Sequence, residues 1–198
     1  MEARAHRMTP ALVAGGLLAH RLAVVDVGTV FTAAARDRPG DVGTPWSWAP
    51  EVLLQPGKRR GGARGGAAAL IADAVLHYES ADGSTWRWLI EVDRGTYPVA
   101  RLVAKLTAYA SWWQSPHSCS WHDARLLFVV DLPLAAAARR IAALAHQAWT
   151  APLRRTGHRR LRIGAVGYAT LAGAGPWARV VTDVLSEHQA LVDATLTR

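Results

Sequence analysis

The sequence predicts an α/β domain in which a mixed β-sheet is flanked by helices. Three observations favour this class. Two apolar segments at 70–78 and 86–93 are separated by a turn, helical spacing follows at 98–113, and strand and helix patterns alternate from 124 onward. A hairpin followed by alternating helices and strands is typical of a sheet with both antiparallel and parallel pairs.

The N-terminal quarter is expected to be helix and loop. Residues 10–36 fit one or two helices, with Asp26 at the N-cap of the second. Residues 38–50 hold proline, glycine and two tryptophans, and residues 55–66 are rich in glycine, so both are expected to be loops. We therefore expect an N-terminal helical segment and loop at 1–50 and an α/β core at 51–198, together forming one compact domain.

The core elements follow from local patterns. The connection at 79–85 contains Asp-Gly, which is typical of a hairpin turn. Pro98 suits the first turn of a helix over 98–113, whose apolar residues recur at helical spacing. A continuous apolar run predicts a buried strand at 124–133. Beyond it we expect a helix at 134–149, a strand at 160–171 and a helix at 179–196.

Composition narrows the class of protein. With 198 residues, 51% of them hydrophobic and 19% charged, the chain can bury a core as a single domain. No stretch approaches 18 uninterrupted apolar residues, so we expect no membrane span. The single cysteine, Cys119, excludes an internal disulfide framework and fits the reducing cytoplasm.

The charge balance indicates a polyanionic partner. The net charge is +8, and all 23 basic residues except Lys58 and Lys105 are arginines. Arginine makes bidentate contacts to phosphate, so we predict DNA as the partner; a solvated surface is the alternative. The DNA-binding candidates lie in two runs and are Arg59, Arg60, Arg64, Arg154, Arg155, Arg159 and Arg160. The sequence leaves open whether the chain forms a homodimer or joins a larger protein complex.

Two acids end a strand that otherwise looks buried. Side chains alternate along a strand, so Glu91 and Asp93 point to one face. A hairpin centred on Asp82 would place Asp73 directly opposite Glu91, whereas a two-residue Asp-Gly turn would place it opposite Val92. In the first register the three acids share one face of the sheet.

Three carboxylates at one place would repel each other unless a cation lay among them. Mg²⁺ or Mn²⁺ prefers carboxylate oxygens, and such a site activates water for phosphodiester hydrolysis. Lys105 lies at the border of the apolar stripe of its helix and can reach the acids, with Tyr109 one turn further on. The metal ligands predicted in this way are Asp73, Glu91 and Asp93, and Lys105 completes the catalytic set. In the structural alternative, Asp93 pairs with Arg94 and Asp73 caps a turn.

These residues also resemble a known family. The segments ADAVLHY (72–78), WRWLIEVDRGT (86–96) and RLVAKLTAYASW (101–112) resemble the core signature of the actinobacterial replication-relaxation family. Residues 19–36 resemble the helix that precedes this core, and the resemblance spans roughly residues 18–135. The Glu-x-Asp-Arg-Gly-Thr piece is the most specific part.

The resemblance in turn implies a restriction-endonuclease-like core of the PD-(D/E)xK nuclease type. Asp73 and Glu91 match the acids of that superfamily, but Asp93 stands where its lysine is usual. Some branches carry the lysine on the following helix, where Lys105 and Tyr109 lie. We therefore expect a Mg²⁺-dependent deoxyribonuclease linked to replication of plasmids or mobile elements. The alternative is a non-catalytic DNA-binding or assembly subunit with a degenerate nuclease fold.

Overall fold

The computed structural model describes residues 16–42, 47–54, 70–121, 123–150, 162–176 and 181–184. Within them, six strands form one sheet in the order β1-β2-β3-β4-β5-β6. The strands are β1 (Trp48–Leu54), β2 (Leu70–Glu79), β3 (Thr85–Asp93), β4 (Arg125–Val130), β5 (Ile163–Gly167) and β6 (Thr182–Asp183). The helices are α2 (Gly16–Arg36), α3 (Val99–Trp113), α4 (Leu134–Thr150) and α5 (Tyr168–Ala174), with the 3₁₀ helix η2 (Pro116–Trp121).

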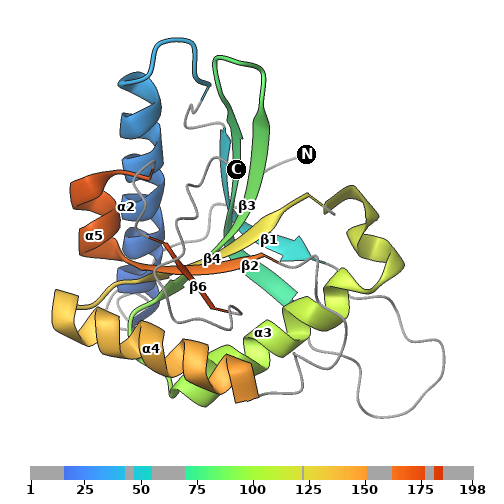
Figure 1. Cartoon of the computed structure of the whole chain (residues 1–198), viewed down its shortest axis with the longest axis vertical. Helices are drawn as coiled ribbons and strands as arrows, with labels where there is room; N and C mark the ends of the chain where they lie inside the picture. The colour runs from blue at the N-terminus through green and yellow to red at the C-terminus, as the bar shows by residue number, and fades with distance from the viewer. Residues whose placement is uncertain are drawn as a thin grey trace.

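The sheet is mixed, as the sequence predicts. Strands β1, β2 and β3 form an antiparallel meander, β3, β4 and β5 are parallel, and β6 is antiparallel to β5. Crossover connections between parallel strands are right-handed, and both crossovers here step in the same direction along the sheet. Helices α3 and α4 therefore lie side by side on one face, while α2 and α5 cover the other (Figure 1).

Each face of the sheet has its own core. On the α3–α4 face, Leu89, Leu126 and Phe128 pack with Leu106 and Leu144. On the α2–α5 face, the strand residues that alternate with these pack against the two helices. This core includes Ile90, Val92, Leu127 and Val129 from the strands and Val27, Phe31 and Leu171 from the helices. The central strands are buried on both faces, which explains their continuous apolar sequences.

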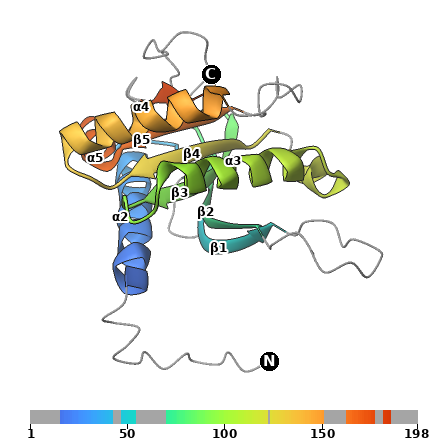
Figure 2. The same ribbon diagram turned by 90° about the horizontal axis from the view of Figure 1, so that it is seen from below.

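Helix α2 is long and apolar. It is one helix, among the described residues, with the length and composition to cross a membrane. Buried core helices and signal sequences meet the same criterion. In the structure one side of α2 packs on the sheet through Val24, Val27 and Phe31, and Gly28 lets the ring of Trp48 approach closely. Figure 2 shows α2 from below, standing across the strands.

Most predicted elements are confirmed, namely the hairpin at 70–93, the helix at 98–113, the strand within 124–133 and the helix at 134–149. Four expectations at the periphery are wrong. Asp26 is not an N-cap, because α2 runs through it without interruption. Trp48 begins an edge strand instead of extending a loop, and an edge position tolerates Pro50.

The other two errors concern the C-terminal part. The strand expected at 160–171 ends at Gly167, and Tyr168 begins α5. A run of small and apolar residues does not show by itself where a buried strand gives way to a helix. Thr182–Asp183 pairs with β5 as a strand inside the segment expected to be helical; residues 185–196 lie outside the described residues.

The β2–β3 hairpin has the register that brings the acids together. Ala74 pairs with Ile90 and Tyr78 with Trp86, so the hairpin is centred on Asp82. The regular ladder stops at Ala74, one residue before Asp73. The next rung of the same register would join Asp73 to Glu91.

Strand β2 changes face at Asp73. Ala72 packs in the core under α3 and α4, whereas Ala74 packs in the core under α2, although residues two apart in a regular strand share a face. On β1, Glu51 lies across from Asp73 and has a φ of 52°, a left-handed conformation rare for a non-glycine residue. The distortion turns Asp73 into the opening between β2 and β3, where helices of both faces reach it.

Candidate active site

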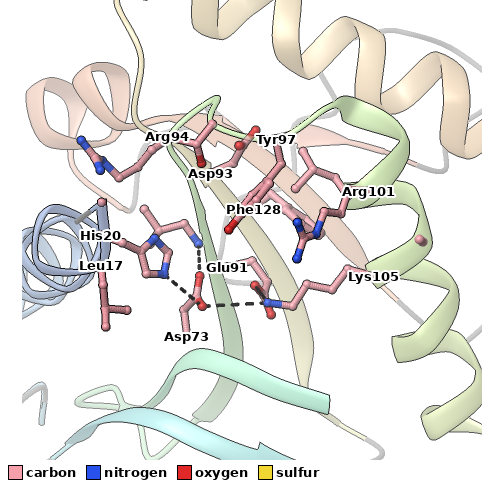
Figure 3. Close-up of a pocket in the computed structure, with 15 residues that line it drawn as sticks. Leu17, His20, Asp73, Glu91, Asp93, Arg94, Tyr97, Arg101, Lys105 and Phe128 are labelled. Atoms are coloured by element: carbon pink, nitrogen blue, oxygen red, sulfur yellow. Dashed lines mark hydrogen bonds and ion pairs between the residues drawn. The ribbon is translucent and has the colours of Figure 1, made fainter. Parts of the chain in front are cut away.

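A cavity of about 690 Å³ lies at the carboxyl end of β3. Carboxyl ends of strands are the usual place for ligand sites in open α/β sheets. One wall is formed by Leu17 and His20 of α2, and the floor by Asp73, Glu91 and Phe128 (Figure 3). The opposite wall is formed by Tyr97, Arg101 and Lys105, and Arg94 lies on the side of α2 (Figure 3).

Asp73 is held from three directions. Its Oδ1 lies 3.2 Å from Nε2 of His20 and 3.9 Å from Nζ of Lys105, and the backbone N–H of Val92 donates to its Oδ2 at 2.8 Å. Burial alone would raise the pKa of Asp73, but the hydrogen bond from His20, the charge of Lys105 and the N–H of Val92 outweigh it. The pKa of Asp73 therefore lies below its usual value, and this carboxylate is charged at neutral pH.

Glu91 lies deeper and behaves in the opposite way. The residue is only 3% exposed, and its carboxylate accepts hydrogen bonds from Nζ of Lys105 and from the hydroxyl of Tyr109. Burial first, and then the negative charge of Asp73, raise the pKa of Glu91 to about 8 although Lys105 and Tyr109 favour its charged form. Two neighbouring carboxyl groups with pKa values moved in opposite directions are typical of functional sites.

Helix α3 supplies the basic and phenolic groups from one face. Arg101, Lys105 and Tyr109 are each four residues apart, so they follow one another along the helix surface. Lys105 is about one-third exposed and its Nζ lies between Asp73 and Glu91. Tyr109 is fully buried, and burial together with the charge of Glu91 raises its pKa well above the usual value, so it stays a donor.

Asp93 shares a face with Glu91 but meets a different helix. Its Oδ2 accepts from Nε of Arg140 on α4 at 2.7 Å, and its Oδ1 accepts from Nη2 of Arg140 at 3.1 Å and from the N–H of Gly95 at 2.9 Å. The two side chains are 3% and 14% exposed. Both oxygens of Asp93 are thus engaged in a buried bidentate ion pair.

The turn after β3 is built around this pair. Gly95 has a φ of 70°, which favours glycine, and a β-carbon there would lie 3.1 Å from the side chain of Leu132. The backbone oxygen of Asp93 accepts from the N–H of Asp131 at 2.9 Å. The rim of the cavity therefore starts from a backbone fixed to both β4 and α4.

Of the predicted site residues, the structure brings Asp73, Glu91 and Lys105 into contact. Asp93 lies at the same strand end, but its carboxylate is paired with Arg140. Arg94 is paired with Asp131 instead, with 3.7 Å between Nε and Oδ2. The three acids do not form one group. All seven DNA-binding candidates, at 59–64 and 154–160, lie outside the described residues.

Two contributors were not predicted from the sequence. Helix α2 is mostly apolar, and its charged residues, Arg21, Asp26 and Arg36, are exposed. His20 is a polar residue on the packing side of this helix, which is a usable signal. Arg140 gave no local signal, because its partner is 47 residues away and only the crossing of α4 over β3 brings the two together.

The donors present suit a cation through two carboxylates rather than three. Among the described residues, no group of three or more His, Cys, Asp or Glu side chains could hold a metal ion. Asp73 and Glu91 are nevertheless coupled through Lys105 and line one cavity. Mg²⁺ commonly binds through one or two carboxylates and completes its shell with water and phosphate oxygens. The pair fits that pattern, and Asp93 does not belong to it.

The environment of Glu91 predicts a pH dependence of stability. The pKa of Glu91 is about 8 in the folded chain, against a usual value of 4.5, so the folded state holds the extra proton between these values. This contribution to stability is complete below the lower value and is lost as the pH rises through about 8. In metal-free buffer, we expect wild type to lose roughly 4 kcal/mol more than Glu91→Gln between about pH 5 and pH 9.

Urea unfolding at a series of pH values measures this difference directly. The subtraction of the Glu91→Gln curve removes the opposite contribution of His77, whose pKa is lowered by burial and by Arg87. Parallel curves for the two proteins would show that the pKa of Glu91 is not raised in the folded chain.

Comparison with known proteins identifies the family. The family model for replication-relaxation matches residues 2–125, which is more than half of the chain and includes Asp73, Glu91, Asp93, Lys105 and Tyr109. Neither a curated protein nor a solved structure gives a significant match. The description of the family suggests a role in replication. The chain belongs to the replication-relaxation family.

Proposed function

We propose that this protein is a metal-dependent phosphodiesterase that acts on DNA, with its centre at Asp73, Glu91 and Lys105. One observation supports the proposal above all. Two carboxylates from adjacent strands and one lysine from the next helix meet in a cavity at the end of the sheet. The resemblance to PD-(D/E)xK nucleases implies acids at Asp73 and Glu91, and some branches of that superfamily carry the lysine on the following helix, where Lys105 lies.

Asp73 and Glu91 would hold Mg²⁺ or Mn²⁺. Bound there, the ion would polarise the phosphate and lower the pKa of the attacking water. Glu91 is the residue that gains most from a cation, because burial and Asp73 together disfavour its charged form.

The remaining groups would act on the phosphate and on the two acids. Lys105 would stabilise the negative charge that builds on the phosphate oxygens, since its Nζ reaches the cavity and both carboxylates. Tyr109 donates to Oε1 of Glu91 and fixes the orientation of that carboxylate. His20 contacts Asp73 from the opposite wall and fixes the orientation of that carboxylate in the same way.

DNA is the proposed substrate because the protein is strongly basic. The net charge is +8, and Arg94 and Arg101 line the cavity beside Lys105. Phosphate contacts from arginine position DNA without reading its sequence. Membership of the replication-relaxation family suggests the setting, and replication of plasmids or mobile elements is part of the proposal.

A second candidate is a non-catalytic DNA-binding or assembly subunit. A specific observation favours it, namely that the acids already have protein partners. Arg140 forms an ion pair with Asp93, and Lys105 and Tyr109 donate hydrogen bonds to Glu91. In this case the acids would serve packing and the arginines alone would act on DNA.

Metal removal separates the two candidates. We expect the protein to cut plasmid and linear DNA in Mg²⁺ or Mn²⁺ and to lose all cutting in EDTA, because hydrolysis depends on the cation at the acid pair. Gel electrophoresis measures the cleavage of the DNA, and the binding of the protein is measured on the same DNA. Salt-sensitive DNA binding with no cutting in either metal would leave the non-catalytic subunit.

A further inference from the structure

Tyr97 is an exposed aromatic residue at the mouth of the cavity. It lies in the loop between β3 and α3, lines the cavity, and is 50% exposed. Single exposed apolar residues are common and need no special explanation. What distinguishes Tyr97 is how firmly its surroundings hold it.

The backbone at Tyr97 is anchored to the buried ion pair. Nη2 of Arg140 donates to the carbonyl oxygen of Tyr97 at 2.5 Å, and the same guanidinium is fixed by both oxygens of Asp93. Pro98 follows directly and restricts the conformation of Tyr97. An exposed ring on a fixed backbone loses little further entropy when a ligand stacks on it.

One cationic side chain lies against the ring, and two more line the cavity. The guanidinium carbon of Arg101 lies 4.0 Å from the ring centroid of Tyr97, which is a cation–π contact. Arg94, Arg101 and Lys105 line the same cavity, as Figure 3 shows. An aromatic surface beside cationic groups is the combination by which proteins bind single-stranded nucleic acid, with bases stacked and phosphates paired.

The size of the cavity agrees with an unpaired nucleotide. At about 690 Å³ it falls within the range of roughly 300–1,000 Å³ that holds small ligands. A base inside a duplex is already stacked on its neighbours and would have to leave the helix to reach Tyr97. A base in a single strand or at a frayed end is free to stack.

We infer that Tyr97, backed by Arg101, is a stacking platform for an unpaired base next to the phosphate at the acid pair. The protein would then prefer single-stranded or frayed DNA over a closed duplex. The inference rests on the proposed function in one respect, since it takes the cavity as the site that receives DNA.

The test is a binding measurement in EDTA, where no cutting can occur. Fluorescence anisotropy would compare a single-stranded oligonucleotide, a hairpin duplex, and a strand of abasic deoxyribose phosphates of equal length. Tyr97→Ala should weaken single-strand binding by roughly 5- to 150-fold, the range for loss of one stacked base. It should leave binding of the duplex and the abasic strand within about twofold, and Tyr97→Phe should bind all three as wild type does.

Leu134→Ala serves as the matched control, because Leu134 is 66% exposed at the start of α4 and does not line the cavity. Equal weakening on all three ligands, no weakening, or no measurable single-strand binding by wild type would overturn the inference. The cutting assay in Mg²⁺ is separate. Absence of cutting with a selective loss in Tyr97→Ala would reject the phosphodiesterase and retain the stacking platform.

Discussion

Glu91→Gln is expected to lower the rate of metal-dependent DNA cutting by about 10³-fold while DNA affinity stays within about twofold. The substitution keeps the size of the side chain and an oxygen for Tyr109, but it removes the carboxylate charge at the centre of the cavity. Its effect should therefore appear in the chemical step and not in DNA binding, which the proposal assigns to arginine.

The size of this effect follows from the charge that is lost. A metal ion stabilises developing phosphate charge by several kcal/mol, and a factor of 10³ corresponds to about 4 kcal/mol. Asp73 would be the single carboxylate left to hold the ion, already neutralised in part by Lys105 and His20. Rates at increasing Mn²⁺ concentration would show whether weak metal binding accounts for the loss.

Glu79→Gln is the matched control for this experiment. Glu79 lies at the far end of the same β2–β3 hairpin, its side chain is exposed, and it does not line the cavity. It should cut as wild type does. Cutting that survives unchanged in Glu91→Gln would show that Glu91 takes no part in catalysis and would remove the acid pair from the proposal.

The central part of the fold could be predicted because local pattern and tertiary structure agree there. Strands β2, β3 and β4 are apolar runs and helices α3 and α4 have helical patterns; of the two hairpin registers that the sequence left open, the structure has the one centred on Asp82. In that register, side-chain alternation on the strands and the position of Lys105 on its helix predict the meeting of Asp73, Glu91 and Lys105.

The parts that escaped prediction depend on distant contacts. Edge strand β1 pairs with β2, and β6 pairs with β5. Neither β1 nor β6 has a strong strand pattern of its own, so the pairing with a neighbour defines each of them. The face change at Asp73 lies across from Glu51, whose left-handed backbone on the neighbouring strand has no local sequence signal. Alternation could place Glu91 and Asp93 on one face, but it could not show that α3 covers the first and α4 the second.

Arg140→Met should destabilise the fold by about 3–5 kcal/mol, which is the largest effect on stability that we expect from a single substitution. Methionine keeps much of the apolar stem of arginine, so the change removes mainly the charge. Asp93 would be left as a buried carboxylate with the N–H of Gly95 as its one remaining hydrogen-bond donor among those described above. Urea unfolding at neutral pH would measure the loss, and the melting temperature should fall by roughly 10 °C.

Two further variants show that the effect belongs to the pair. Arg139→Met changes the neighbouring arginine, which is exposed on the same helix, and should stay within about 0.5 kcal/mol of wild type. The double variant Asp93→Asn/Arg140→Met leaves no buried charge, so its loss should be clearly smaller than the sum of the two single losses.

This cycle also decides what Asp93 is for. The sequence placed it among the metal ligands, at a position where the resemblance expects a lysine, whereas the structure pairs it with Arg140. If the pair is structural, Mg²⁺ should stabilise wild type and the double variant equally, because the proposed cation site lies at Asp73 and Glu91. If Arg140→Met proves harmless and the double variant loses its response to Mg²⁺, Asp93 is a ligand after all. A buried ion pair and a metal ligand make opposite demands on the same carboxylate, so the two results distinguish these roles of Asp93.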